Sequence, residues 1–325
     1  MERKTHGCAI AAGIVLLSAI TLWHAYFYGA AALFAGLQQW QAAPAVKGSI
    51  ELSRYRAVVQ AKPLSGIEHN LSGLTFDTHT GTLFGIANAP SRIVQITTDG
   101  EVLRVIPVTG GKDTEGITHL GDNNFMVVDE KKNTLWSIEI TQQTQEVFLE
   151  GASHLVLELD PLHKNLGIEA MSWSERNQTL WVGQEKWPMH VQELAVAPIT
   201  GTHESAAEQL VPHPLREWES SGFGKWLIRD LASMTQLEES GHLLMLSQES
   251  GVVVEYTVGG EALSILPLWC GWQGLKDAIP QPEGLTVDPQ GNLYIVSEPN
   301  LFYRFEKPSQ PSKKTTPVPD GDKRT

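Results

Sequence analysis

A two-part motif recurs five times along the chain, and this recurrence restricts the possible folds more than any other feature of the sequence. The first part begins with a polar residue and continues with a small residue, an aliphatic residue and, in most copies, Thr or Ser. Its copies are residues 72–75 (SGLT), 115–118 (EGIT), 169–172 (EAMS), 233–235 (SMT) and 283–286 (EGLT). The second part follows after turn-forming residues, at 84–88 (FGIAN), 126–130 (MVVDE), 181–185 (WVGQE), 245–249 (MLSQE) and 294–298 (YIVSE). Each copy therefore predicts a β-hairpin.

The spacing of the copies predicts a β-propeller. A third hydrophobic strand follows every hairpin and a fourth follows some of them, and the opening residues are 43, 54, 64 and 50 residues apart. Repeats of about 40–50 residues with four short strands are typical of propeller blades. A β-sandwich also has regularly spaced turns, but the nearly constant spacing within the motif favours an all-β, five-bladed β-propeller over residues 55–307.

Two segments at the ends of the repeat predict how the ring closes. The last copy stops after its third strand at Phe305, and residues 55–60 alternate as a strand does but precede the first copy. We therefore predict that residues 55–60 supply the outer strand of the last blade.

The opening residue of each copy defines a candidate metal site. The innermost strand of every blade lines the central channel, so equivalent residues form a ring, here Ser72, Glu115, Glu169, Ser233 and Glu283. Three carboxylates in a narrow channel repel one another unless a cation lies between them. Calcium accepts six to eight oxygen ligands in flexible geometry, whereas magnesium requires a strict octahedron and zinc prefers His or Cys. The ring predicts Ca²⁺; carboxylates that are solvated or paired with Lys and Arg are the alternative.

The last residue of each second part forms another set, Asn88, Glu130, Glu185, Glu249 and Glu298. We expect this set near the opposite mouth of the channel, where it would support the metal, hold a second cation, contact a substrate or bond to the next blade's backbone. His69 and His119 are the histidines nearest to the first ring in sequence and are candidates for acid–base chemistry.

The N-terminal region predicts export. Residues 8–37 contain no Lys, Arg, Asp or Glu, and about 20 apolar residues suffice to cross a membrane. With Arg3 and Lys4 on the cytoplasmic side, we predict a cytoplasmic segment 1–7, a single-pass inner-membrane anchor 8–37, a linker 38–54 and a periplasmic propeller. A signal peptide cleaved near residues 30–32 is the alternative. Residues 308–325 are predicted to be a disordered tail.

Charge and composition narrow the function. There are 24 Lys and Arg against 37 Asp and Glu, a net charge of −13, which argues against nucleic acid as a partner. Cys8 and Cys270 are too few for a disulfide scaffold or a thiolate zinc site. Because we find none of the common nucleophile or phosphate-binding motifs, we predict a module that binds an unknown small ligand or protein at the propeller face. The alternative is a calcium-dependent phosphoesterase or lactonase with Glu185 or Glu298 as general base.

Three segments carry a resemblance to a known family. Residues 281–286 (QPEGLT), 294–305 (YIVSEPNLFYRF) and 121–130 (GDNNFMVVDE) resemble the SdiA-regulated (YjiK-like) family of membrane-anchored bacterial proteins, over residues 55–307. The resemblance implies a five-bladed propeller, distantly similar to NHL-repeat proteins, with calcium in the domain and no established activity. The ring alone is also similar to the calcium ring of calcium-activated nucleotidases, whose run of Arg and Lys for phosphate we do not find here.

Overall fold

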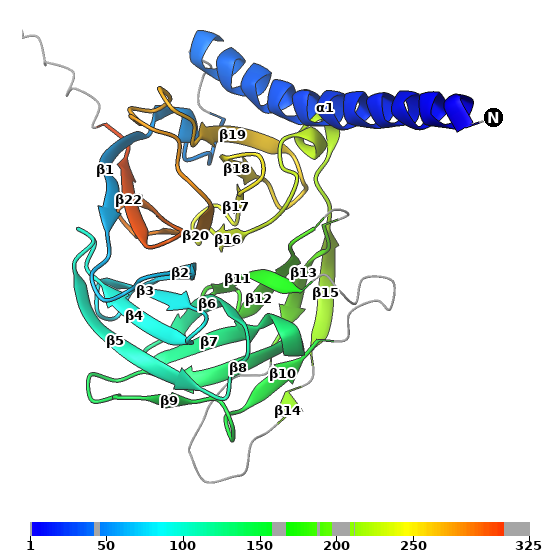
Figure 1. Ribbon diagram of the computed structural model, residues 1–325. Coiled ribbons are helices and arrows are strands. Elements are labelled where there is room, and N and C mark those ends of the chain that lie inside the picture. The colour runs from blue at the N-terminus through cyan, green and yellow to red at the C-terminus, as the bar shows by residue number, and fades with distance from the viewer. Residues whose placement is uncertain are drawn as a thin grey trace, which may run out of the picture.

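The chain forms a ring of five β-sheets with a long helix lying against its edge (Figure 1). This computed structural model describes residues 2–41, 46–157, 167–186, 189–196, 209–210 and 212–308. Most of the predicted tail, residues 309–325, lies outside the described residues. The five predicted blades and the all-β propeller are confirmed.

The sheets follow one another along the chain, and each runs from an inner to an outer strand. Blade 1 contains β2 (Leu71–Asp77), β3 (Thr82–Ala87), β4 (Arg92–Ile96), β5 (Val102–Thr109) and the short β9 (Val147–Phe148). Blade 2 contains β6 (Thr114–Gly121), β7 (Asn124–Asp129), β8 (Thr134–Glu139), β10 (His154–Val156) and the short β14 (Gln209–Leu210). Blade 3 contains β11 (Ile168–Ser174), β12 (Thr179–Gln184), β13 (Val191–Ala195) and β15 (His213–Trp218).

Blade 4 contains β16 (Ser233–Gln236), β17 (Leu243–Ser247), β18 (Val252–Tyr256) and β19 (Ala262–Pro267). Blade 5 contains β20 (Pro282–Val287), β21 (Leu293–Ser297), β22 (Leu301–Glu306) and, as its outer strand, β1 (Arg56–Pro63). The pairing of β1 with β22, with Ala57 opposite Phe305, confirms the predicted closure of the ring. The first and last strands of the propeller are thus held in one sheet.

The small second residue of the motif is needed where neighbouring inner strands meet. A Cβ on Gly73 would lie 2.9 Å from the carbonyl oxygen of Glu115, and one on Gly116 would lie 2.8 Å from that of Glu169. The same holds for Gly284, whose Cβ would lie 2.9 Å from the Ser72 carbonyl oxygen. These backbones lie too close together to leave room for a side chain, so glycine at these positions allows the inner strands to approach one another around the ring.

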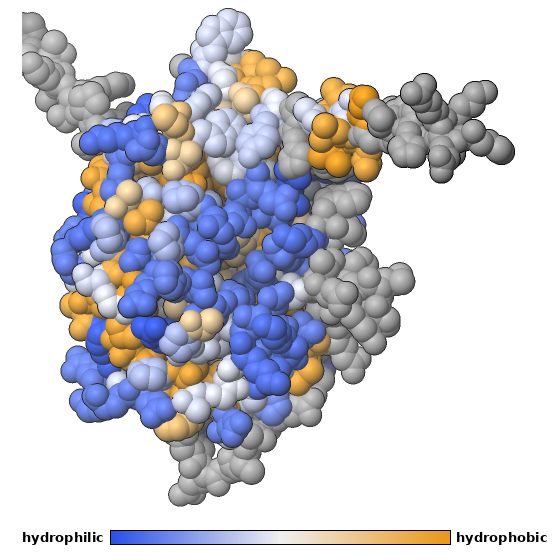
Figure 2. All heavy atoms as spheres, viewed as in Figure 1, coloured by the Kyte–Doolittle hydropathy of each residue, from blue (hydrophilic) through white to orange (hydrophobic). Residues whose placement is uncertain are grey.

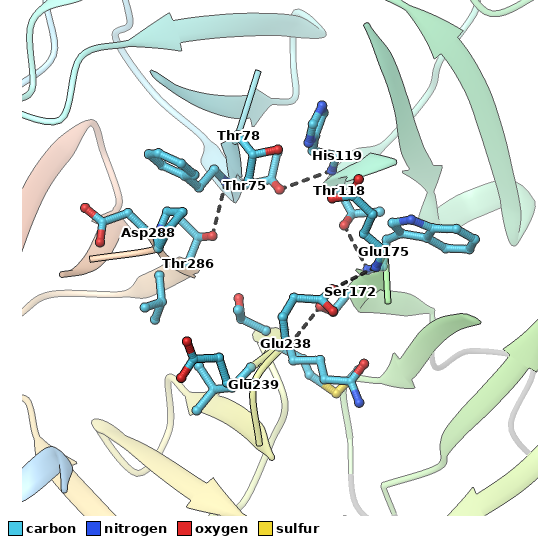
Figure 3. Close-up of a pocket in the computed structure, with 18 of the residues that line it drawn as sticks. Thr75, Thr78, Thr118, His119, Ser172, Glu175, Glu238, Glu239, Thr286 and Asp288 are labelled. Atoms are coloured by element: carbon cyan, nitrogen blue, oxygen red, sulfur yellow. Dashed lines mark hydrogen bonds between the residues drawn. The ribbon is translucent and has the colours of Figure 1, made fainter. Parts of the chain in front are cut away.

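The hydroxyl residue of the motif ties each inner strand to the next blade. Backbone N–H groups donate to the side-chain oxygens of Thr75, Thr118, Ser172 and Thr286 at 2.8–3.1 Å; the donors are His119, Trp173, Gln236 and Phe76. In blade 4 the direction differs, because the Thr235 hydroxyl donates to the Leu285 carbonyl oxygen at 2.8 Å. These bonds, several of which are drawn in Figure 3, link blade to blade around the axis.

Thr118→Val is expected to lower the free energy of unfolding by about 1–3 kcal/mol, because the isosteric side chain leaves the Trp173 N–H without its acceptor. Equilibrium denaturant unfolding measures this, with Thr78→Val as the control because Thr78 is exposed. Equal stability of the two variants would contradict a structural role for the hydroxyl.

Helix α1 (Glu2–Gln41) extends beyond both ends of the predicted anchor and covers the outer edge of blade 4. Ala31 and Ala35 are buried there, the Gln38 amide N–H donates to the Leu263 carbonyl oxygen at 2.8 Å, and the Ile265 N–H donates to the Gln38 side chain at 3.2 Å. Gln38 thereby occupies the free hydrogen-bonding groups of edge strand β19. Within the part of the chain that the structure describes, no helix has both the length and the apolarity that a membrane span requires.

The segment that follows is also fixed to blade 4. In the stretch predicted as a linker, residues 52–54 form the 3₁₀ helix η1 (Leu52–Arg54). The fully buried carboxylate of Glu255 accepts hydrogen bonds from the Ser49 hydroxyl at 2.6 Å and the Ile50 N–H at 3.0 Å. Residues 49–54 therefore belong to the folded body.

Candidate metal centre

The predicted ring residues lie at one end of the channel. Glu115, Glu169 and Glu283 are the second residues of inner strands β6, β11 and β20, and each is partly buried. Ser72 and Ser233 occupy the corresponding ends of β2 and β16. The charges of the three glutamates act on one another across blades. We call this end of the channel the acidic mouth.

The two serines differ in what their hydroxyls contact. The Ser72 hydroxyl bonds to Glu115 and lies 3.4 Å from the Asn70 carbonyl oxygen. The Ser233 oxygen instead accepts the Leu285 N–H of blade 5 at 3.1 Å. Ser72 is therefore placed beside a ring carboxylate, whereas Ser233 serves the contact between blades.

The second set of polar residues lies at the same mouth, so the expectation of an opposite mouth was wrong. In the antiparallel hairpins Thr114 pairs with Asp129, Ile168 with Gln184 and Pro282 with Ser297. The end of each second strand therefore lies beside the start of the first, because the chain reverses between them. This places Glu130, Glu185 and Glu298 next to the ring and concentrates the negative charge.

The geometry adds one carboxylate that the motif did not include. Ligand oxygens of Asp113, Glu115 and Glu130 lie within 4.8 Å of one another. Asn88 bridges two of these residues, since its amide donates to Glu115 and, at 3.3 Å, to Asp113. Asp113 lies in the bend just before β6, and its position two residues before Glu115 was the available signal.

Burial and neighbouring charge raise the pKa values of the ring carboxyls. Burial raises the pKa of Glu283 to about 8, and Glu298 and Glu115 add to the shift. Burial, followed by Glu185 and Glu130, raises the pKa of Glu169 still further. The pKa of Glu115 is also raised, chiefly by burial and despite its bond from Ser72. Without a cation these groups therefore resist ionisation together.

Cations of the protein neutralise the periphery of the mouth. Lys131 lies 2.7 Å from Asp113, Lys186 pairs with Glu185, and Arg229 lies 3.1 Å from Glu249. Among the described residues, no Lys or Arg forms an ion pair with Glu115, Glu169 or Glu283. The alternative in which the ring glutamates are paired with basic side chains is not found.

Of the two candidate histidines, His119 lies away from the site. His119 is buried near the other end of β6, where its Nε2 lies 3.2 Å from Asp77 and 3.0 Å from the Asp122 carbonyl oxygen. His69 is exposed. His119 is near the ring in sequence but not in space, since a residue four positions along an extended strand lies roughly 13 Å away.

The fold and this site define a five-bladed β-propeller with a carboxylate-lined mouth. The model of the SdiA-regulated family matches residues 47–306, and the chain belongs to that family. Among solved structures, a glutaminyl cyclase from Myxococcus xanthus is 9% identical with a TM-score of 0.52, covering 78% of this chain and 95% of that one. A gluconolactonase from Xanthomonas campestris is 12% identical with a TM-score of 0.44, covering 78% and 97%. The first of these likenesses supports the fold alone.

Proposed function

We propose that this protein is a calcium-binding propeller that presents one face to a small ligand or a partner protein. The observation that carries the proposal is the convergence of Glu115, Glu169 and Glu283 from three blades without basic partners among the described residues. Ionised carboxylates in one region repel one another unless a hard cation lies among them.

The donor set fits a cation that prefers oxygen. Glu115 would hold it together with Asp113 and Glu130, whose ligand oxygens lie within 4.8 Å of one another. Glu169 and Glu283 would complete the set from blades 3 and 5, and Ser72 lies close to Glu115. Ser233 fits less well because its oxygen already accepts a backbone N–H. Bound there, Ca²⁺ would supply the positive charge that lets the carboxyls ionise and would tie three blades together.

The contacts of Glu185, one of the two candidate general bases, favour a binding function over hydrolysis. The Glu185 carboxylate is paired with Lys186 and its backbone groups join neighbouring segments, which suits a structural role. A calcium-dependent hydrolase is the alternative function. Assays of phosphoester and lactone hydrolysis in the presence of calcium, with the parent chain and with Glu298→Gln, test it.

We also propose that the chain is tethered to the inner membrane with the propeller in the periplasm. The basis is the run without charged residues at 8–37. The contacts of α1 with the propeller involve Tyr26 and residues C-terminal to it, so the tether would use residues 8–25, about 27 Å of helix. Protection of an N-terminal tag, but not of the propeller, from protease added to spheroplasts tests this arrangement.

The dependence of stability on pH tests the calcium proposal. Folding raises the pKa of the ring carboxyls, so their contribution to stability is fully present below the pKa that they have in the unfolded chain. That contribution is lost as the pH rises through the pKa that they have in the folded protein. With chelator, the melting temperature of the full chain in mild detergent is expected to fall by about 5 °C or more between pH 5 and 9. Millimolar calcium should remove most of this fall, since it binds the ionised form. If the melting temperature changed with pH in the same way in chelator and in calcium, the calcium proposal would be contradicted.

A further inference from the structure

The other end of the channel holds a cavity of about 610 Å³ that the metal centre does not use. Residues of all five inner strands line it, and Figure 3 shows their side chains arranged around the axis. The turns after β11 and β16 form part of its rim, which also includes Gly48 and Ile50 of the segment that follows α1. Its volume is that of a site for a small organic molecule.

The charge of the lining has one sign. Four carboxylates line the cavity, namely Glu175, Glu238, Glu239 and Asp288, and no lining residue is Lys or Arg. Asp288 is used internally, since it accepts bonds from Asn292 and the Tyr294 hydroxyl. Among the described residues, Glu175, Glu238 and Glu239 form no ion pair, so their charge is available to a ligand.

Glu175, Glu238 and Glu239 do not form a compact metal-binding group. In the described part of the chain, the one group of three or more acidic, His or Cys residues with ligand atoms within 4.8 Å is Asp113, Glu115 and Glu130, at the acidic mouth. Glu238 is also fixed in place, because it accepts the N–H groups of Glu175 at 2.7 Å and Arg176 at 3.2 Å. Glu238 is therefore held, and carboxylates that do not gather around one ion can each meet a different positive charge of one ligand.

Apolar groups complete the lining. Phe76, Met171 and Trp173 present apolar surface, and aromatic rings attract organic cations. Gln236 is another lining residue; it is buried, and its amide N–H donates to the Gly241 carbonyl oxygen at 3.2 Å.

We propose that this cavity binds a small organic cation, specifically a linear diamine or polyamine whose ammonium groups meet Glu175, Glu238 and Glu239 around an apolar body. The proposal does not depend on the calcium site, because the two lie at opposite ends of the inner strands. The matched probes are 1,8-diaminooctane and 1,8-octanediol, which share a chain length and differ in charge.

The test is isothermal titration calorimetry on the full chain in mild detergent with saturating calcium. The diamine is expected to bind at least tenfold more tightly than the diol, and Glu175→Gln/Glu239→Gln to weaken diamine binding about tenfold. Glu146→Gln is the control, because Glu146 is exposed and its carboxylate bonds to Thr109 near the outer edge of blade 1.

The outcomes separate this site from the acidic mouth. Glu283→Gln should bind the diamine with an affinity within twofold of the parent chain. The Glu175→Gln/Glu239→Gln double variant should show the same rise in melting temperature with calcium as the parent chain. Equal binding of diol and diamine, or equal weakening by Glu146→Gln, would overturn the proposal. Loss of diamine binding in Glu283→Gln alone would place the cation at the acidic mouth and overturn it as well.

Discussion

Glu169→Gln is expected to raise the melting temperature of the calcium-free protein by about 5 °C and to remove most of the stabilisation that calcium gives. The two effects have opposite signs for one reason. Burial, together with the charges of Glu185, Glu130, Glu283 and Glu115, opposes the ionised form of Glu169 in the folded protein. Folding of the calcium-free chain at pH 8 therefore requires Glu169 to take up a proton, which a neutral amide of the same shape does not need. The same amide weakens the hold on a divalent cation. Differential scanning fluorimetry at pH 8, with calcium and with chelator, measures both.

The opposite signs distinguish a metal ligand from a structural carboxylate. Glu146→Gln removes one negative charge from an exposed position and should change neither value. A structural carboxylate would give the reverse pattern, with Glu169→Gln less stable than the parent chain in chelator and an unchanged response to calcium. That result would refute the metal centre.

The number of blades could be predicted because each motif position has a repeated physical task. Gly73, Gly116 and Gly284 stand where inner backbones meet, and Thr75 and Thr118 accept N–H groups from the next blade. These demands recur in most sectors of the ring, so they recur in the sequence; blade 4, with Met234 at the second position, is the exception. Ring closure could be predicted for a related reason, since a lone strand before the first copy and a missing one after the last can satisfy each other.

Other features could not be read from the repeat. The fourth strands of blades 2 and 3, β10 and β15, vary in sequence because outer strands meet no symmetric partner at the axis. The docking of α1 depends on Ala31, Ala35 and Gln38 meeting β19, which are far apart in sequence. From the apolar run alone we predicted a membrane anchor, so only the fold reveals this contact.

The candidate site likewise contains residues that the repeat predicts and residues that it does not. Glu115, Glu169 and Glu283 occupy repeat positions, and their common mouth follows from symmetry. Asp113 does not repeat in the other blades and was missed. The cavity at the other end was missed because Glu175 and Glu239 come from turns of different length outside the motif. Figure 2 shows hydrophilic residues gathered over the middle of one face of the ring.

Gly116→Ala is expected to lower the free energy of unfolding by about 3 kcal/mol, and the melting temperature by about 10 °C. The new Cβ would lie 2.8 Å from the Glu169 carbonyl oxygen and 3.0 Å from a methyl carbon of Val128. Neither atom can move aside easily, since one is backbone and the other is in the core. Strand β6 must therefore move away from β11. Denaturant unfolding in chelator measures the cost without a contribution from metal.

The same displacement should reach the metal centre, because Gly116 adjoins Glu115 and its new methyl group would press on the residue that carries the second carboxylate. We therefore expect calcium to bind Gly116→Ala about tenfold more weakly than the parent chain, a loss of about 1.4 kcal/mol. Gly259→Ala is the matched control, since its Cβ would meet only the Thr257 hydroxyl, at 3.6 Å. If Gly116→Ala were as stable as Gly259→Ala, the inner strands would not be in contact and the glutamates would not share a site. If stability fell while calcium affinity held, the packing would be right and the ion would lie elsewhere.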